Sequence, residues 1–78
     1  MILSDIHCGQ NVTITGFGEN MTKETKQRLA DLGLYENRAI RLLRYSPFGG
    51  PLSIVVGGLV LALDKQLAQQ IIVNTSAV

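Results

Sequence analysis

Residues 28–73 read RLADLGLYENRAIRLLRYSPFGGPLSIVVGGLVLALDKQLAQQIIV, and this stretch decides the fold. Gly33 follows a helical pattern, and the apolar runs after it are cut by PFGGP at 47–51 and by Gly57-Gly58. Glycine and proline supply backbone angles that other residues resist, so each cluster separates two elements. The predicted order is helix, strand, turn, strand, turn, strand, short helical turn and final strand. So many turns rich in glycine and proline within so few residues predict a small, tightly turned β-barrel.

Two elements precede or open this stretch. Apolar and polar residues alternate over Asn11–Phe17, which predicts a first strand with one buried side. A helix is expected at about residues 22–32, with Asn20 or Thr22 as its N-cap. Gly33 favours a left-handed C-cap, after which the next residue can contact the last turn of the helix. One helix face is apolar and is expected to pack on the barrel; it carries Met21, Thr25, Leu29 and Leu32.

The apolar runs supply the other strands. Residues 38–45 are expected to form a second strand with Ile40 and Leu42 inward. Near Leu43, however, apolar residues would fall on both faces of a regular strand. Either a bulge lies near Leu43, or the second face is covered by the helix or a partner. Gly57-Gly58 fits a two-residue hairpin turn. The remaining elements are expected at Leu52–Val56, Leu59–Leu63, a helical turn from Asp64 through Ala68, and Gln70–Asn74.

These elements predict one mainly β domain over residues 1–78. Five short strands with meander connections favour closure into a barrel, because closure protects edges that an open sheet would expose. The expected architecture is a small SH3-like barrel with one α-helix after the first strand and a short helical turn before the last. A β-grasp-like open sheet is the alternative. Residues 75–78 are expected to form a flexible tail.

The composition indicates apolar surface beyond what a core needs. The 78 residues are 46% hydrophobic and 17% charged, whereas about 25% charged residues is usual. Some apolar residues must therefore face outward. They form either a surface for a partner or an oligomer, or the ordinary apolar surface that any protein has. The formal net charge of +1 argues against non-specific electrostatic binding of nucleic acid or anionic lipid.

The N-terminus and the cysteine content predict a cytoplasmic protein. The opening MILSDIHCGQ has neither a basic region nor a long apolar core, so no signal peptide is expected. The longest apolar stretch, residues 52–63, has about half the length needed to span a bilayer. Cys8 is the single cysteine and cannot form an internal disulfide, which fits a reducing compartment.

No residue set for catalysis, metal binding or cofactor binding stands out. His7 and Cys8 are too few ligands for a specific metal site, and adjacent side chains diverge in an extended chain. Residues 4–7 include Ser, Asp and His, but without a nucleophile-elbow signature. Gly16-x-Gly18 lacks the rest of a dinucleotide fingerprint, and no P-loop with its lysine is present. We therefore expect a protein that is not an enzyme and has no cofactor or metal of its own.

Four pieces of this sequence stand in a distinctive order and spacing: Leu29-x-x-Leu32-Gly33-Leu34, Ile40-x-Leu42-Leu43, Arg44-x-x-Pro47-x-Gly49-x-Pro51-Leu52 and Leu61-Ala62-Leu63. Together they resemble the FeoA family, the small accessory proteins of bacterial ferrous iron transport. The similarity extends from Leu3 to Val73. Members often read Gly-Asp-Pro where this chain has Gly49-Gly50-Pro51, and they commonly carry a basic residue at the position of Asp64 and an Arg near Gly57-Gly58. Surface contacts that depend on those charges are therefore not inferred for this chain.

The resemblance implies a cytoplasmic SH3-like domain that works beside a large membrane permease carrying a GTP-binding domain. The implied role is to bind that ferrous iron permease or its GTPase domain and to modulate iron uptake. The protein would then meet the membrane only through this partner. Related domains also lie at the C-terminus of iron-dependent repressors, where they act as interaction modules.

Two outward-facing groups are the candidate contact surfaces. The loop 47–51 holds two prolines that reduce its ordering entropy, and Phe48 is an apolar anchor unless it folds back to cap the barrel. Val55, Val60 and Ala62 have outward parity on adjacent strands and can form an apolar patch for the helix, a second copy or the permease. The residues expected to contact a partner are Leu34, Arg44, Pro47, Phe48, Pro51, Val55 and Val60.

Two rival functions remain open at this level. Arg38, Arg41 and Arg44 form a basic run on the second strand, and small barrels can bind RNA. In a regular strand Arg41 points away from the other two, and few aromatic residues are available for stacking, so nucleic acid is not the expected partner. The second rival is a self-associating structural domain, that is, a homo-oligomer.

Overall fold

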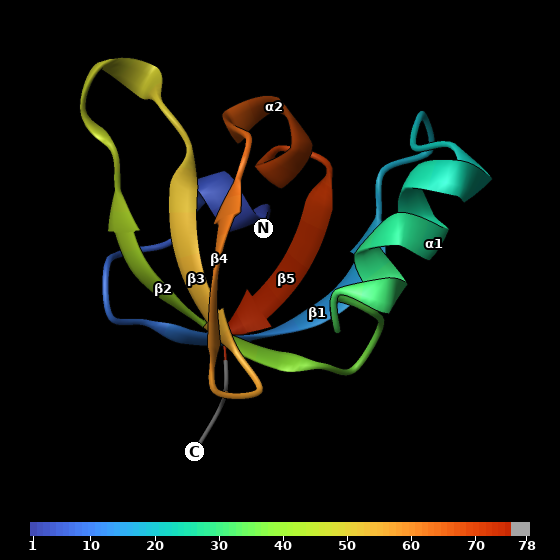
Figure 1. The fold of residues 1–78 in the computed structure, drawn as a ribbon, viewed down its shortest axis with the longest axis horizontal. Helices are drawn as coiled ribbons and strands as arrows, with labels where there is room; N and C mark the ends of the chain where they lie inside the picture. The colour runs from blue at the N-terminus through green and yellow to red at the C-terminus, as the bar shows by residue number, and fades with distance from the viewer. Residues whose placement is uncertain (76–78) are drawn as a thin grey trace.

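The computed structural model describes residues 1–75, which form one antiparallel five-stranded sheet with helices beside it (Figure 1). The strands follow the order β4-β3-β2-β1-β5 across the sheet. The predicted mainly β fold, with one helix after the first strand and a helical turn before the last, is confirmed. No helix in this part of the chain is long and apolar enough to cross a membrane. The elements are η1 Leu3–Asp5, β1 Asn11–Phe17, α1 Lys23–Asp31, β2 Ala39–Tyr45, η2 Pro47–Gly49, β3 Leu52–Val56, β4 Leu59–Leu63, α2 Lys65–Ala68 and β5 Ile71–Thr75.

The sheet curls strongly but remains open between β4 and β5, the two strands at its ends. Closure was expected because it would protect both edges. Instead, the N-terminal residues cover the edge of β5: the Val73 N–H donates to the Met1 carbonyl at 2.8 Å, and Ile2 forms a bridge with Ile72. Among residues 1–75, no strand other than β3 pairs with β4. One edge of the sheet is therefore protected, and the other has no partner strand in the described part of the chain.

The core lies inside the curl of the sheet, where alternate residues of β1, β2 and β3 point inward. Val12 and Ile14 are fully buried on β1, and Ile54 is fully buried on β3. The short η1 turn adds Leu3 and the neighbouring Ile6 to the same core. The sequence pattern did not predict this contribution, because a single turn is too short to show periodicity.

Helix α1 begins and ends with the caps that its sequence predicts. The Thr22 hydroxyl accepts the Thr25 N–H at 3.2 Å, and Gly33 has φ +96°. The Leu34 N–H donates to the Leu29 carbonyl at 2.8 Å, the long-range bond of a Schellman cap. The cap turns the chain so that Leu34 is buried, whereas Leu32 is 45% exposed. The prediction that Leu32 packs on the barrel is therefore wrong.

A β-bulge interrupts the pairing of β2 with β3 between Leu42 and Arg44, which is the first of the two explanations that the sequence left open for the apolar residues near Leu43. Arg41 pairs with Val55, and Arg44 pairs with Ser53. Directly paired residues point to the same face of a sheet, so both arginines lie on its outer face. The expectation that Arg41 points away from Arg44 is thus wrong, because it assumed a regular strand.

The end of the chain departs from its predicted boundaries. Thr75 belongs to β5, where it pairs with Val12 of β1, and not to a flexible tail. The rest of the predicted tail, residues 76–78, lies outside the described residues. Asp64 occupies the N-cap position of α2 as expected, but its side chain makes no capping hydrogen bond.

Candidate partner-binding surfaces

The loop between β2 and β3 stands away from the body of the sheet (Figure 1). Phe48 at its tip is completely exposed, at 104% of the reference area, and adopts φ +61°, a left-handed conformation rare for a bulky side chain. Pro47 and Pro51 are also exposed. The alternative in which Phe48 folds back over the barrel is therefore wrong. An aromatic ring held in water on a strained backbone is typical of a contact residue.

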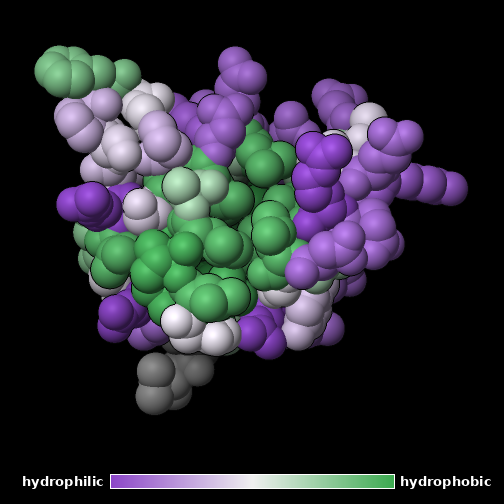
Figure 2. Space-filling model, in the orientation of Figure 1, coloured by the Kyte–Doolittle hydropathy of each residue, from purple (hydrophilic) through white to green (hydrophobic). Residues whose placement is uncertain are grey.

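The structure gathers three of the predicted contact residues on the outer face of the sheet. Val55 of β3 pairs with Val60 of β4, and Arg44 of β2 lies on the same face. Val60 is 62% exposed, and Val55 is half-buried. Figure 2 shows a broad apolar area on the side of the molecule where β4 lies in Figure 1. Leu34 does not lie with this group, because its side chain is fully buried in the core.

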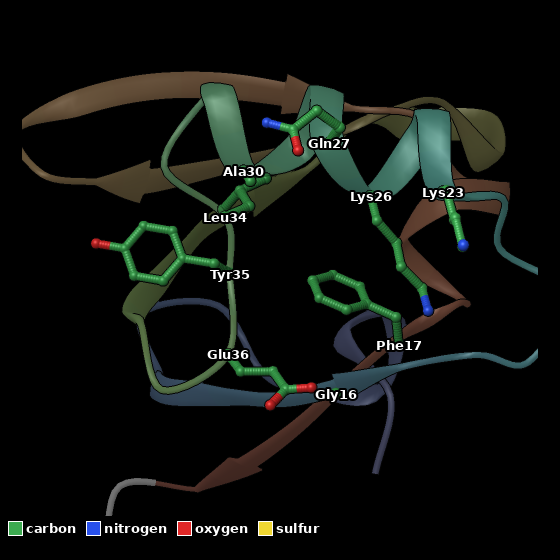
Figure 3. A pocket seen from close by; sticks show the side chains of 9 residues that line it. All are labelled: Gly16, Phe17, Lys23, Lys26, Gln27, Ala30, Leu34, Tyr35 and Glu36. Carbon is green, nitrogen blue, oxygen red and sulfur yellow. The ribbon is translucent and has the colours of Figure 1, made fainter.

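A cleft that the sequence pattern did not predict lies between α1, the end of β1 and the segment after α1. We call it the α1–β1 cleft; it has a volume of about 600 Å³ and is open to solvent. Figure 3 shows the Phe17 ring pointing into it from β1, with Lys26 descending from α1 on one side. Tyr35 stands at the opposite end, and Ala30 and Leu34 approach from above. The cleft thus has an apolar interior and a polar margin.

The margin of the α1–β1 cleft has separated charges. Lys23 and Lys26 lie three residues apart on one face of α1, and Glu36 lies across from them. Within residues 1–75 neither lysine side chain makes a hydrogen bond or an ion pair. Both lysines also lie in the first half of the helix, whose dipole adds positive potential there. This side of the cleft therefore favours a carboxylate.

The sequence contained only indirect signals for this cleft. Lys23, Lys26, Gln27 and Ala30 share a helix face, but a stripe of polar and small residues predicts a solvated surface. Phe17 ends its strand and is only partly buried, so alternation says nothing about what its ring faces. Gly16 also lines the cleft, and a Cβ built there meets no atom within 4 Å.

Tyr45 connects the N-terminal turn to β2, and its surroundings shift the pKa of its phenol. Its hydroxyl donates to the carbonyl oxygen of Ser4 at 3.0 Å and also contacts that of Ile6. Burial raises the pKa of the Tyr45 phenol, and the nearby Cys8 and Asp5 raise it further. The phenol therefore stays protonated and acts as a structural donor.

No group of three or more His, Cys, Asp or Glu side chains within residues 1–75 could hold a metal ion. His7 and Cys8 are both exposed. What the described surface offers is contact area: an exposed aromatic loop, an apolar outer face and a cationic cleft. These features suit recognition of another macromolecule.

Comparison with known families identifies the chain. The model of the FeoA domain matches residues 1–75. The chain belongs to the FeoA family. The predicted resemblance is therefore confirmed, and membership supports a role in iron transport.

Solved structures agree with this assignment. The solution structure of the FeoA protein from Chlorobium tepidum is 28% identical, with a TM-score of 0.89 over 99% of this chain and 71% of that one. The crystal structure of an iron uptake regulatory protein, FeoA, is 29% identical, with a TM-score of 0.82 over 94% of this chain and 93% of that one. No curated protein matches the sequence.

The same fold also occurs as part of longer chains. The crystal structure of ScaR with bound Zn²⁺ is 25% identical, with a TM-score of 0.82 over 96% of this chain but only 36% of that one. The FeoA-like fold thus exists both in FeoA proteins and as one part of a longer polypeptide.

Proposed function

We propose that this FeoA-family protein is a non-enzymatic accessory of ferrous iron uptake that binds the cytoplasmic, GTPase-containing part of a membrane iron permease and modulates transport. The observation that carries the proposal is the family match over residues 1–75. The described surface supports a binding role, because its distinctive features are an exposed aromatic loop and a cationic apolar cleft.

The α1–β1 cleft favours one kind of partner segment. Phe17, Ala30 and Tyr35 provide apolar contacts, while neither Lys23 nor Lys26 makes an ion pair with another side chain of residues 1–75. An apolar side chain next to an acidic residue would satisfy both features. Because the cleft is open along one side, it suits an exposed peptide segment better than an enclosed small molecule.

The Phe48 loop supplies a second contact. A fully exposed aromatic ring loses its water on binding, and the flanking prolines limit the entropy cost of ordering the loop. Two separated contacts would let the domain hold its partner in one orientation.

The test is co-purification with the intact permease, using charge reversals on two faces of α1. Lys26→Glu places a negative charge at the cleft, whereas Arg28→Glu makes the same charge change on the same helix at a residue that does not line the cleft. We expect Lys26→Glu to weaken binding about tenfold or more, as for a charge placed against its complement. Arg28→Glu should retain most of the binding. Ferrous iron uptake by cells carrying each variant should follow the same order.

Two results would count against the proposal. Failure of the wild-type protein to bind either the intact permease or its cytoplasmic part would exclude the proposed partner. Binding to generic RNA that weakens steeply with added salt would instead favour the rival function of nucleic-acid binding. Arg41 and Arg44, which lie on the same outer face of the sheet, would then supply phosphate contacts.

A further inference from the structure

The two edges of the sheet differ in a way that the proposed function does not use. The β5 edge is covered by the backbone of Met1 and Ile2, whereas among residues 1–75 only β3 pairs with β4. Proteins usually protect an exposed edge with charged side chains, proline or a bulge. The β4 strand, Leu-Val-Leu-Ala-Leu at 59–63, has none of these, and its pairing with β3 is regular throughout.

The geometry of the β3–β4 hairpin fixes which backbone groups face the free edge. Val56 and Leu59 flank the two-residue turn and form its closing hydrogen-bonded pair. Leu59, Leu61 and Leu63 therefore direct their backbone groups toward β3. The N–H and C=O groups of Val60 and Ala62 point away from the sheet. These four groups are available to another strand.

We propose that the β4 edge pairs with the β4 edge of a second copy of this chain, antiparallel and about a two-fold axis at Leu61. In this register Val60 of each copy pairs with Ala62 of the other, and all four outward groups of each copy are satisfied. Leu61 faces the second copy's Leu61 across the axis. Leu59, which is 63% exposed, and Val60, which is 62% exposed, become covered.

Charge complementarity supports a second copy as the occupant. The same register places Asp64 of one copy opposite Gly58 of the other. The Arg38 guanidinium lies against the neighbouring Gly57, where an added Cβ would collide with it. Arg38 interacts with the hydroxyl and ring of Tyr35 but with no carboxylate among residues 1–75. Each Asp64 therefore meets an unneutralised Arg38 of the other copy, and symmetry makes this contact twice.

The covered β5 edge limits the assembly to two copies. A head-to-tail arrangement would need β4 of one copy to pair with β5 of the next, which could continue into a ring or a filament. Met1 and Ile2 occupy that edge in each copy. A β4–β4 pair uses the one sheet edge that residues 1–75 leave free, and it closes at a dimer. Because each copy contributes one five-residue strand, the contact is small and the dimer should dissociate on dilution.

Sedimentation velocity over a concentration range of about a hundredfold tests the proposal. The wild-type mass should rise from monomer toward dimer as concentration increases. Val60→Lys puts a charge on the edge at an exposed position and should keep the protein monomeric. Phe48→Lys removes an exposed apolar side chain from a different surface and should dimerise like the wild type. A wild-type protein that remains monomeric throughout, or a Val60→Lys variant that dimerises normally, would overturn the proposal.

Cysteine cross-linking tests the register independently. In a Cys8→Ser background, Leu61→Cys places the two sulfurs across the axis, at a separation that a disulfide can span. Leu59→Cys lies two positions from the axis, so its copies are too far apart to join. Rapid cross-linking of Leu61→Cys with little for Leu59→Cys is expected; equal rates would contradict the register. Circular dichroism of each variant establishes that the fold is retained. Because the β4 substitutions lie in neither the α1–β1 cleft nor the Phe48 loop, dimerisation and permease binding can fail separately.

Discussion

Gly33 is the residue on which the end of α1 depends. Its φ of +96° is a conformation in which a side chain costs about 1–2 kcal/mol. We therefore expect Gly33→Ala to lower the free energy of unfolding by about that amount. Gly16→Ala is the matched control, because Gly16 has no positive φ and a Cβ there meets open space. Urea denaturation of both variants makes the comparison, and an equal loss in the two would contradict this role of the backbone.

Tyr45 couples stability to alkaline pH. Its pKa in the folded protein lies above the ordinary value of 10.0, so the folded state holds the proton more tightly than the unfolded state does. The stability that this provides is complete below about pH 10 and is lost as the pH rises through the folded pKa. Tyr45→Phe should lower stability at neutral pH by about 1 kcal/mol through its lost hydrogen bonds.

The stability of Tyr45→Phe should also fall less at alkaline pH than the stability of the wild type does. Measuring the free energy of unfolding of wild type and Tyr45→Phe from neutral to strongly alkaline pH isolates the contribution of the phenol. Parallel curves for the two proteins would show that the phenol does not contribute.

Helix α1 illustrates what local sequence determines at the scale of an element. Its N-cap hydroxyl and its C-terminal glycine act within a few residues, so both ends were predictable to within one residue. Thr22→Ala should cost about 1 kcal/mol of stability, because it leaves the Thr25 N–H without its partner. Thr22→Ser keeps the hydroxyl and should recover most of that loss in thermal unfolding. A Thr22→Ser variant as unstable as Thr22→Ala would argue against the cap.

The features that the sequence did not predict all depend on how elements meet. The bulge near Leu43 was foreseen as one of two options, but its effect on Arg44 required the pairing with β3. The covered β5 edge requires residues 1 and 2 to meet residues 72 and 73, which no local pattern encodes. The α1–β1 cleft arises from the placement of a polar helix face over Gly16 and Phe17. Phe48 was predicted to contact a partner, but the sequence left open whether its ring is exposed or folds back over the barrel.

At the scale of the whole molecule, three surfaces are separate on the fold. The α1–β1 cleft, the Phe48 loop and the β4 edge come from different elements, so substitutions in one leave the residues of the others in place. In the proposals above, the first two surfaces bind the permease and the third binds a second copy of the chain. A dimer of this kind would present two clefts to the transport machinery.

Amide NMR titration of this protein with the soluble GTPase-containing part of the permease tests the central claim most directly. The proposed function predicts saturable shifts that cluster at the α1–β1 cleft, around Phe17, Lys26 and Tyr35, and at Phe48. Lys26→Glu should shift the titration midpoint to about tenfold higher partner concentration, whereas Arg28→Glu should not. An absence of shifts, or shifts that avoid both surfaces, would contradict the account.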